Sequence, residues 1–89
     1  MNIPTGVLNR TLLDSFERVH PPAIGGKRLK MFYATQTGTA PVRVRLFVNH
    51  PTCLTPAYRD FLIRTLREKF GLEGAPICLD FKERPRHHD

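Results

Sequence analysis

The 89-residue sequence has no tryptophan, a single serine and only two cysteines. Cys53 and Cys78 belong to no C-x-x-C pair and to no Cys/His cluster at metal-ligand spacing, so the common zinc-site patterns are excluded. We therefore expect two reduced, structural thiols and no metal. No apolar run approaches the roughly 18 residues that a membrane-spanning helix needs. We expect a soluble, cytoplasmic protein with no membrane partner.

Sequence patterns of nucleotide binding and catalysis are missing as well. Neither G-x-x-x-x-G-K-[ST] nor G-x-G-x-x-G occurs. Ser15 has no neighbouring histidine that would activate it as a nucleophile, and His20 and His50 each stand alone before a proline. The carboxylates between Glu68 and Glu83 form no pair that spacing would place for acid–base work. We therefore expect this chain to hold no catalytic centre and no cofactor.

Positive charge is present in excess and is gathered in one segment. The formal net charge is +6, and residues 27–50 contain no acid at all. An acid-free basic segment attracts phosphates and raises association rates with anionic partners. We interpret it as a surface for RNA or another acidic partner, and the alternative is a solvated face that keeps the domain soluble. Its five cations are Lys27, Arg28, Lys30, Arg43 and Arg45.

Two amphipathic helices are predicted from apolar residues at helical spacing. The first is expected to begin with Thr5 as its N-cap and to stop at Pro21-Pro22, because proline lacks the N–H that a helix interior needs. The second has a strong start signal at Thr55-Pro56, a capping hydroxyl followed by proline at the first helical position. Gly71 is the expected glycine at its end.

Three strands are predicted over residues 29–36, 42–48 and 77–82. In the first, the pattern predicts that Met31, Tyr33 and Thr35 lie on one face together with Leu29. Valine and leucine alternate with polar residues in the second, and the first two strands should form an antiparallel hairpin. The element order is α-β-β-α-β, and burying both helical stripes on one apolar sheet face gives a two-layer α/β protein of the α+β type.

The opposite face of this sheet would then carry the alternate residues of the strands. Two phenylalanines among cations on an open face could stack on bases or dock a partner. The alternative is that a bulge or a covering segment buries Phe32 or Phe47. We expect residues 1–4 to be the end of a linker, 5–83 to form the domain and 84–89 to form a charged tail. The expected open-face residues are Lys30, Phe32, Arg43, Arg45, Phe47, Asp80 and Lys82.

A series of short motifs runs along the chain from residue 3 to residue 82. The motifs are, in order, Ile3-Pro4-Thr5, Leu8-Asn9, Pro21-Pro22, Gly26-Lys27-Arg28-Leu29-Lys30, Tyr33-Ala34-Thr35-Gln36, Leu46-Phe47-Val48-Asn49, Pro51, Tyr58, Leu66-Arg67, Phe70-Gly71-Leu72-Glu73-Gly74 and Pro76-Ile77. Together they resemble the C-terminal KH-like domain of the Der (EngA) GTPases. Gly71-Leu72-Glu73-Gly74 matches the letters of the G-x-x-G nucleotide clamp of KH domains, but it follows a helix and precedes a strand, so we interpret it as a helix-ending turn.

The resemblance implies a KH-like fold that acts in ribosome biogenesis. It implies contact with large-subunit ribosomal RNA and docking against two tandem GTPase domains, which would bind the GTP. We predict that Phe32 and Phe47 serve in domain docking, and the alternative is a protein–protein docking module with no direct RNA contact. The residues that we predict to contact RNA are Lys27, Arg28, Lys30, Arg43, Arg45 and Lys82.

Overall fold

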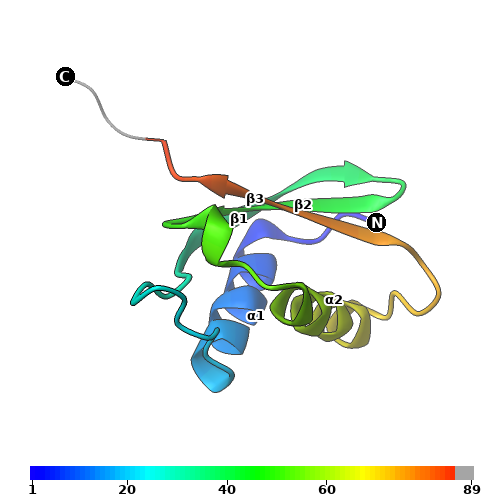
Figure 1. Cartoon of the computed structure of the whole chain (residues 1–89). Coiled ribbons are helices and arrows are strands. Elements are labelled where there is room, and N and C mark those ends of the chain that lie inside the picture. Colours follow the sequence, from blue (N-terminus) through cyan, green and yellow to red (C-terminus); the bar gives the residue numbers. More distant parts are fainter. Residues whose placement is uncertain (86–89) are drawn as a thin grey trace.

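A computed structural model describes residues 1–85 and shows two layers (Figure 1). A three-stranded sheet forms one layer, and two helices pack side by side against a single face of it, as predicted. Residues 86–89 of the predicted tail lie outside the described part. Within that part, neither helix has the length and hydropathy to cross a membrane. The elements are α1 (Thr5–Arg18), β1 (Met31–Thr39), β2 (Val42–Val48), the short 3-10 helix η1 (Pro51–Cys53), α2 (Pro56–Phe70) and β3 (Ile77–Glu83).

Strand β2 is the centre of the sheet. It pairs antiparallel with β1, which confirms the predicted hairpin, and parallel with β3. A parallel pair needs a long crossover connection, and α2 supplies it. The alternate residues of β2 that face the helices are buried, and Leu46 and Val48 are completely inaccessible to solvent. The helix-covered face of the sheet is therefore the core, and we call the other side the open face.

Both ends of α2 follow from local sequence chemistry. The backbone N–H of Tyr58 donates to Thr55 Oγ1 at 3.1 Å, and Pro56 occupies the first turn, as predicted. Gly71 ends the helix in the left-handed conformation with φ 65°, which glycine adopts without steric cost. The Gly71–Gly74 segment is therefore a helix-ending turn that leads into β3.

The prediction that Thr5 caps α1 is wrong. Thr5 is already the first helical residue and Pro4 is the flanking one, and among the described residues no side chain caps the first turn. The preceding chain fixes this start, because Ile3 is buried and its N–H donates to Gln36 Oε1 at 2.8 Å. The chain therefore turns into the helix one residue earlier than the capping pattern suggests.

Helix α1 is attached to the outer edge of β1 by one amide side chain. Asn9 Nδ2 donates to the Ala34 carbonyl oxygen at 2.8 Å, and the Ala34 N–H donates to Asn9 Oδ1 at 2.7 Å. Asn9 thus satisfies the two backbone groups of Ala34 that an edge strand leaves unpaired.

At the other end of α1, the Tyr58 hydroxyl donates to the Val19 carbonyl oxygen at 2.6 Å, and burial raises the pKa of Tyr58 to about 12.

A β-bulge in β1 overturns part of the predicted face assignment. Met31 pairs with Val48 and Tyr33 pairs with Phe47, so Phe32 is an extra residue without a partner on β2. The alternation shifts by one position beyond the bulge. Ala34 is 1% exposed whereas Tyr33 is 44% exposed, so the prediction that Tyr33 and Thr35 share a face with Leu29 and Met31, which are buried, is wrong.

We predict that replacing Asn9 by alanine destabilises the fold by about 1–3 kcal/mol, because a buried edge group loses its partner. Urea denaturation of the variant measures this change. Arg10→Ala, at the next and exposed position of α1, is the matched control and should change the free energy of unfolding by less than about 0.5 kcal/mol. Equal midpoints for the two variants would contradict the role given to Asn9.

Candidate nucleic-acid interface

Three rungs of paired residues cross the open face of the sheet. The first joins Tyr33, Phe47 and Lys82, and it lies next to the bulge. Thr35, Arg45 and Asp80 make the second rung, and Gly38, Arg43 and Cys78 make the third. Because a strand rises about 3.3 Å per residue, the outer rungs lie about 13 Å apart along β2. The predicted cations of β2 and β3 therefore share one face but are spread along it.

The first rung carries a stacked aromatic pair. The ring centroids of Tyr33 and Phe47 are 4.5 Å apart with an interplanar angle of 21°. Offset stacking of this kind stabilises an aromatic pair beyond the area it buries. Phe47 is half-buried beside Tyr33, whose own ring remains open to solvent. Lys82 completes the rung from β3 and is exposed.

Phe32, the extra residue of the bulge, makes cation–π contacts with two basic side chains. The guanidinium carbon of Arg84 lies 3.9 Å from the centroid of the Phe32 ring, and Lys30 Nζ lies 5.8 Å from it. These are cation–π distances. The N–H of Arg84 donates to the Val48 carbonyl oxygen at 3.0 Å, which continues the β2–β3 pairing one residue past the strand. Phe32 is thus only half-buried, and Arg84 covers it.

Arg84 is a site residue that sequence reasoning missed. The signal was present in the period of the third strand. Residues two apart share a sheet face, so the series through Asp80 and Lys82 points to Arg84. Arg84 is the first residue of the predicted tail, so it falls just outside the third strand that the sequence predicts.

Arg45 is engaged by an acid. Its guanidinium donates to both carboxylate oxygens of Asp80, with contacts of 3.0 to 3.2 Å. These hydrogen bonds lower the pKa of Asp80, partial desolvation opposes the shift, and the charges of the surrounding cations add to it. The same contacts raise the pKa of Arg45. Arg45 is therefore less available to a phosphate than the other predicted cations.

Arg43 on β2 pairs with Gly38 on β1, and glycine has no side chain that would occupy the space above it. A Cβ placed on Gly38 would lie 3.1 Å from Arg43 Cδ, so the aliphatic stem of Arg43 lies across the glycine. A larger residue on β1 would force this arginine to move. Glycine thus directs the arginine across the hairpin.

The remaining three predicted cations lie before β1 and not on the sheet. Lys27 follows a tight turn in which Gly25 and Gly26 both have positive φ, and it pairs with Ile24. Asn49, just after β2, anchors the rest of the segment: its Nδ2 donates to the Arg28 carbonyl oxygen, and its Oδ1 accepts the N–H of Lys30. The loop cations are therefore held beside the bulge by one amide side chain.

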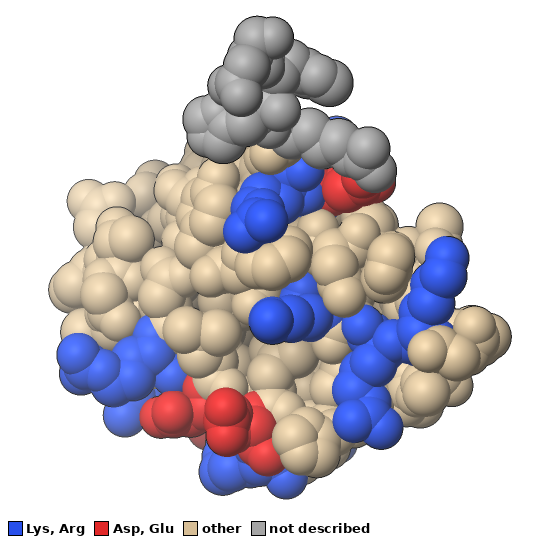
Figure 2. Space-filling model, turned by 90° about the vertical axis from the view of Figure 1, so that its left-hand side faces the viewer, with Lys and Arg blue, Asp and Glu red and all other residues tan. Residues whose placement is uncertain are grey.

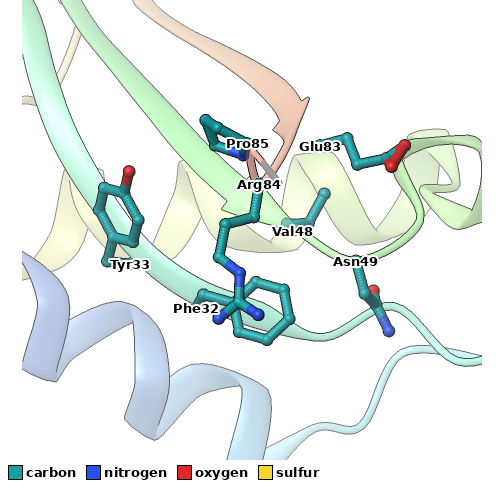
Figure 3. Close-up of a pocket in the computed structure, with 7 residues that line it drawn as sticks. All are labelled: Phe32, Tyr33, Val48, Asn49, Glu83, Arg84 and Pro85. Atoms are coloured by element: carbon teal, nitrogen blue, oxygen red, sulfur yellow. The ribbon is translucent and has the colours of Figure 1, made fainter. Parts of the chain in front are cut away.

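A pocket of about 810 Å³ opens at this end of the sheet. Figure 3 shows the Arg84 guanidinium across the ring of Phe32, with Tyr33 beside them and the carboxylate of Glu83 pointing away. Figure 2 shows several separate groups of Lys and Arg on this side of the molecule, with acidic groups at its lower edge and near its top. The charged groups are therefore separated by uncharged surface. The pocket is lined by Phe32, Tyr33, Val48, Asn49, Glu83, Arg84 and Pro85.

The chemistry of this surface is that of binding. Among residues 1–85, no group of three or more His, Cys, Asp or Glu side chains is placed to hold a metal ion. Cys53 is buried and Cys78 is half-buried, and both are free thiols. Cations, stacked rings and an open pocket suit a partner that is both aromatic and anionic.

The fold is that of a small two-layer α+β domain. Residues 2–82 match the family described as "KH-domain-like of EngA bacterial GTPase enzymes, C-terminal". The chain belongs to this family. It therefore corresponds to the non-catalytic C-terminal domain of such proteins, and the sequence does not include their GTPase domains.

Individual relatives agree with the family. The chain is 41% identical over 87 residues to the GTPase Der of Chlamydia pneumoniae, covering 98% of this chain and 18% of the relative. It is 45% identical to the GTPase Der of Desulforudis audaxviator and 46% identical to that of Syntrophotalea carbinolica, each over 82 residues, which is 92% of this chain and 19% of the relative. The chain thus spans about a fifth of the length of these relatives.

We predict that the pKa of Asp80 lies below its usual range in the folded chain and rises when Arg45 is replaced by glutamine. A carboxyl group with a depressed folded pKa stabilises the fold at higher pH, and this contribution is lost as the pH falls through the folded pKa. Carbon NMR titration of the carboxyl group measures the shift. Arg43→Gln on the same strand face is the control, and an Asp80 titration unaffected by Arg45→Gln would contradict the pairing.

Proposed function

We propose that this chain is an RNA-contacting module that acts in assembly of the large ribosomal subunit in the cytoplasm. The observation that carries the proposal is the open face, where exposed cations flank a stacked aromatic pair. Asp80 is the only acid among the paired residues of the three rungs, and Arg45 already binds it. The relation to the C-terminal domains of EngA GTPases supports the proposal, since a GTPase needs a separate surface to select its target.

The mechanism is electrostatic anchoring with little base specificity. The loop cations beside the bulge, Lys27, Arg28 and Lys30, would meet phosphates together with Lys82 and Arg43 on the sheet. All five side chains are exposed. Contacts to phosphates fix the position and orientation of a protein on RNA, and double-stranded RNA is recognised mainly by shape. Arg45 would join them only after exchanging Asp80 for a phosphate.

A second role, docking against the GTPase domains, is favoured by a separate groove. A groove of about 480 Å³ lies between α1 and the segment before β1, and half of its lining residues are apolar, among them Phe16, Pro21 and Leu29. Leu13 at its rim is 41% exposed. It shares Asn49 with the bulge pocket, and its lining includes Arg28 and Lys30, so a docked GTPase domain and RNA would compete for these two cations. In this proposal the GTPase domains bind the GTP, and this chain rests against them.

We predict steep salt dependence for binding to large-subunit RNA fragments. About five phosphate contacts on single-stranded RNA give a slope of about −3.5 in a plot of log affinity against log salt concentration. Replacing Lys27, Arg28 and Lys30 together by glutamine removes up to three contacts and should make the slope shallower by about 2. Fluorescence anisotropy at several salt concentrations measures both slopes.

The matched control removes the same charge from the helices. The variant with Arg10, Arg64 and Lys69 replaced by glutamine loses three exposed cations that lie on α1 and α2. Its slope should stay close to that of the unchanged chain. A slope near zero for the unchanged chain, with firm binding to the GTPase domains of a Der protein, would favour docking without RNA contact.

A further inference from the structure

Tyr33 presents an unusual aromatic surface. Six large apolar side chains of the described residues are exposed. Tyr33, at 44% exposure, is the one among them that lies on a strand. Phe47 on the neighbouring strand stacks on one face of its ring at 4.5 Å, so the ring is supported from one side. A rigid, supported ring with an open side loses little conformational entropy when another flat group stacks on it.

Arg84 presents its guanidinium group next to this ring. Its guanidinium lies over Phe32 and its backbone is fixed to Val48, so the group is held in place. The N–H groups of a guanidinium point outward in its plane, and stacking on a ring leaves them free. Within residues 1–85, no carbonyl or carboxylate accepts a hydrogen bond from this side chain. The donors are arranged to receive an anion.

Both features line the same pocket. Its volume of about 810 Å³ falls in the range of small-molecule sites, which is roughly 300–1,000 Å³. Glu83 is the acid at its rim, and Figure 3 shows its carboxylate directed away from Phe32 and Tyr33. An anionic ligand can therefore reach Arg84 without passing a carboxylate turned toward it.

We propose that this pocket binds one unpaired nucleotide of a single-stranded RNA, with its base stacked on Tyr33 and a flanking phosphate bound by Arg84. This inference rests on the proposed RNA contact and adds the substrate class to it. An aromatic plane beside a phosphate is what a nucleotide offers. Bases inside a duplex are already stacked and paired, so the platform selects a loop, bulge or strand end.

The site lies on the open face of the sheet, away from the Gly71–Gly74 turn. That turn joins α2 to β3 and carries Glu73, which repels phosphate. The bulge at Phe32 is what places a ring and a cation platform next to each other. Recognition therefore uses strand side chains, and it tolerates any base because every base has a flat aromatic face.

The test uses the 89-residue chain and a short single-stranded oligouridine that carries one fluorescent purine analogue. We expect the fluorescence to be quenched on binding, as the analogue stacks on Tyr33. Tyr33→Leu should weaken binding about 5- to 150-fold, the effect of losing one stacked base, whereas Tyr33→Phe should bind like the unchanged chain. Tyr33 is exposed, and urea denaturation verifies that both variants fold.

A second set of variants tests the phosphate contact. Arg84→Gln should weaken binding and make the salt slope shallower by about 0.7, one contact on a single strand. Arg64→Gln, an equal charge change on the exposed side of α2, should leave both unchanged. An oligonucleotide with an abasic position in place of the analogue, and a duplex of the same length, should each bind more weakly than the single strand.

The outcomes separate this inference from the proposed function. Steep salt dependence, with Tyr33→Leu and the abasic strand as tight as their references, would overturn the base site and leave the RNA-contacting role intact. No binding to any RNA at low salt would overturn both. Tighter binding of an acidic, aromatic peptide than of the single strand would overturn the nucleotide assignment and indicate a protein ligand.

Discussion

The β-bulge at Phe32 is the backbone feature on which the open face depends. One extra residue in β1 keeps Met31 in the core, puts Phe32 under Arg84 and turns Tyr33 outward against Phe47. Without it, strict alternation would bury Tyr33 and leave the end of the sheet without its aromatic pair. One extra residue in a strand thus places two aromatic rings, those of Phe32 and Tyr33, on the open face of the sheet.

Two asparagine side chains make this arrangement rigid from opposite sides. Asn9 attaches α1 to the edge of β1 beyond the bulge, and Asn49 attaches the loop that carries Arg28 and Lys30. Each amide forms hydrogen bonds with backbone groups that the sheet leaves unpaired. The same bonds therefore stabilise the fold and hold the residues of the site in position. The acid of the open face is also placed away from the bulge. Asp80 forms an ion pair with Arg45, so the cations near the bulge can bind external anions.

Local signals predicted much of the fold, since their chemistry acts within a few residues. Thr55-Pro56 and Gly71 bounded α2, and the alternation of β2 placed Arg43, Arg45 and Phe47 on the open face. The position of Tyr33 was not predictable, because the bulge is decided by how β1 aligns with Phe47 and Val48 across the hairpin. The Arg45–Asp80 pair likewise depends on the register of two parallel strands, between residues 35 apart in sequence.

The most direct test of the account is a map of backbone amide chemical shifts as single-stranded RNA is added to the chain. We expect the largest changes at the bulge end of the open face, in residues 30–33, 47–49 and 83–84, and we expect them to diminish as salt is raised. Changes confined to α2 and the Gly71–Gly74 turn would contradict it, because the RNA would then contact the molecule away from the platforms on Phe32 and Tyr33.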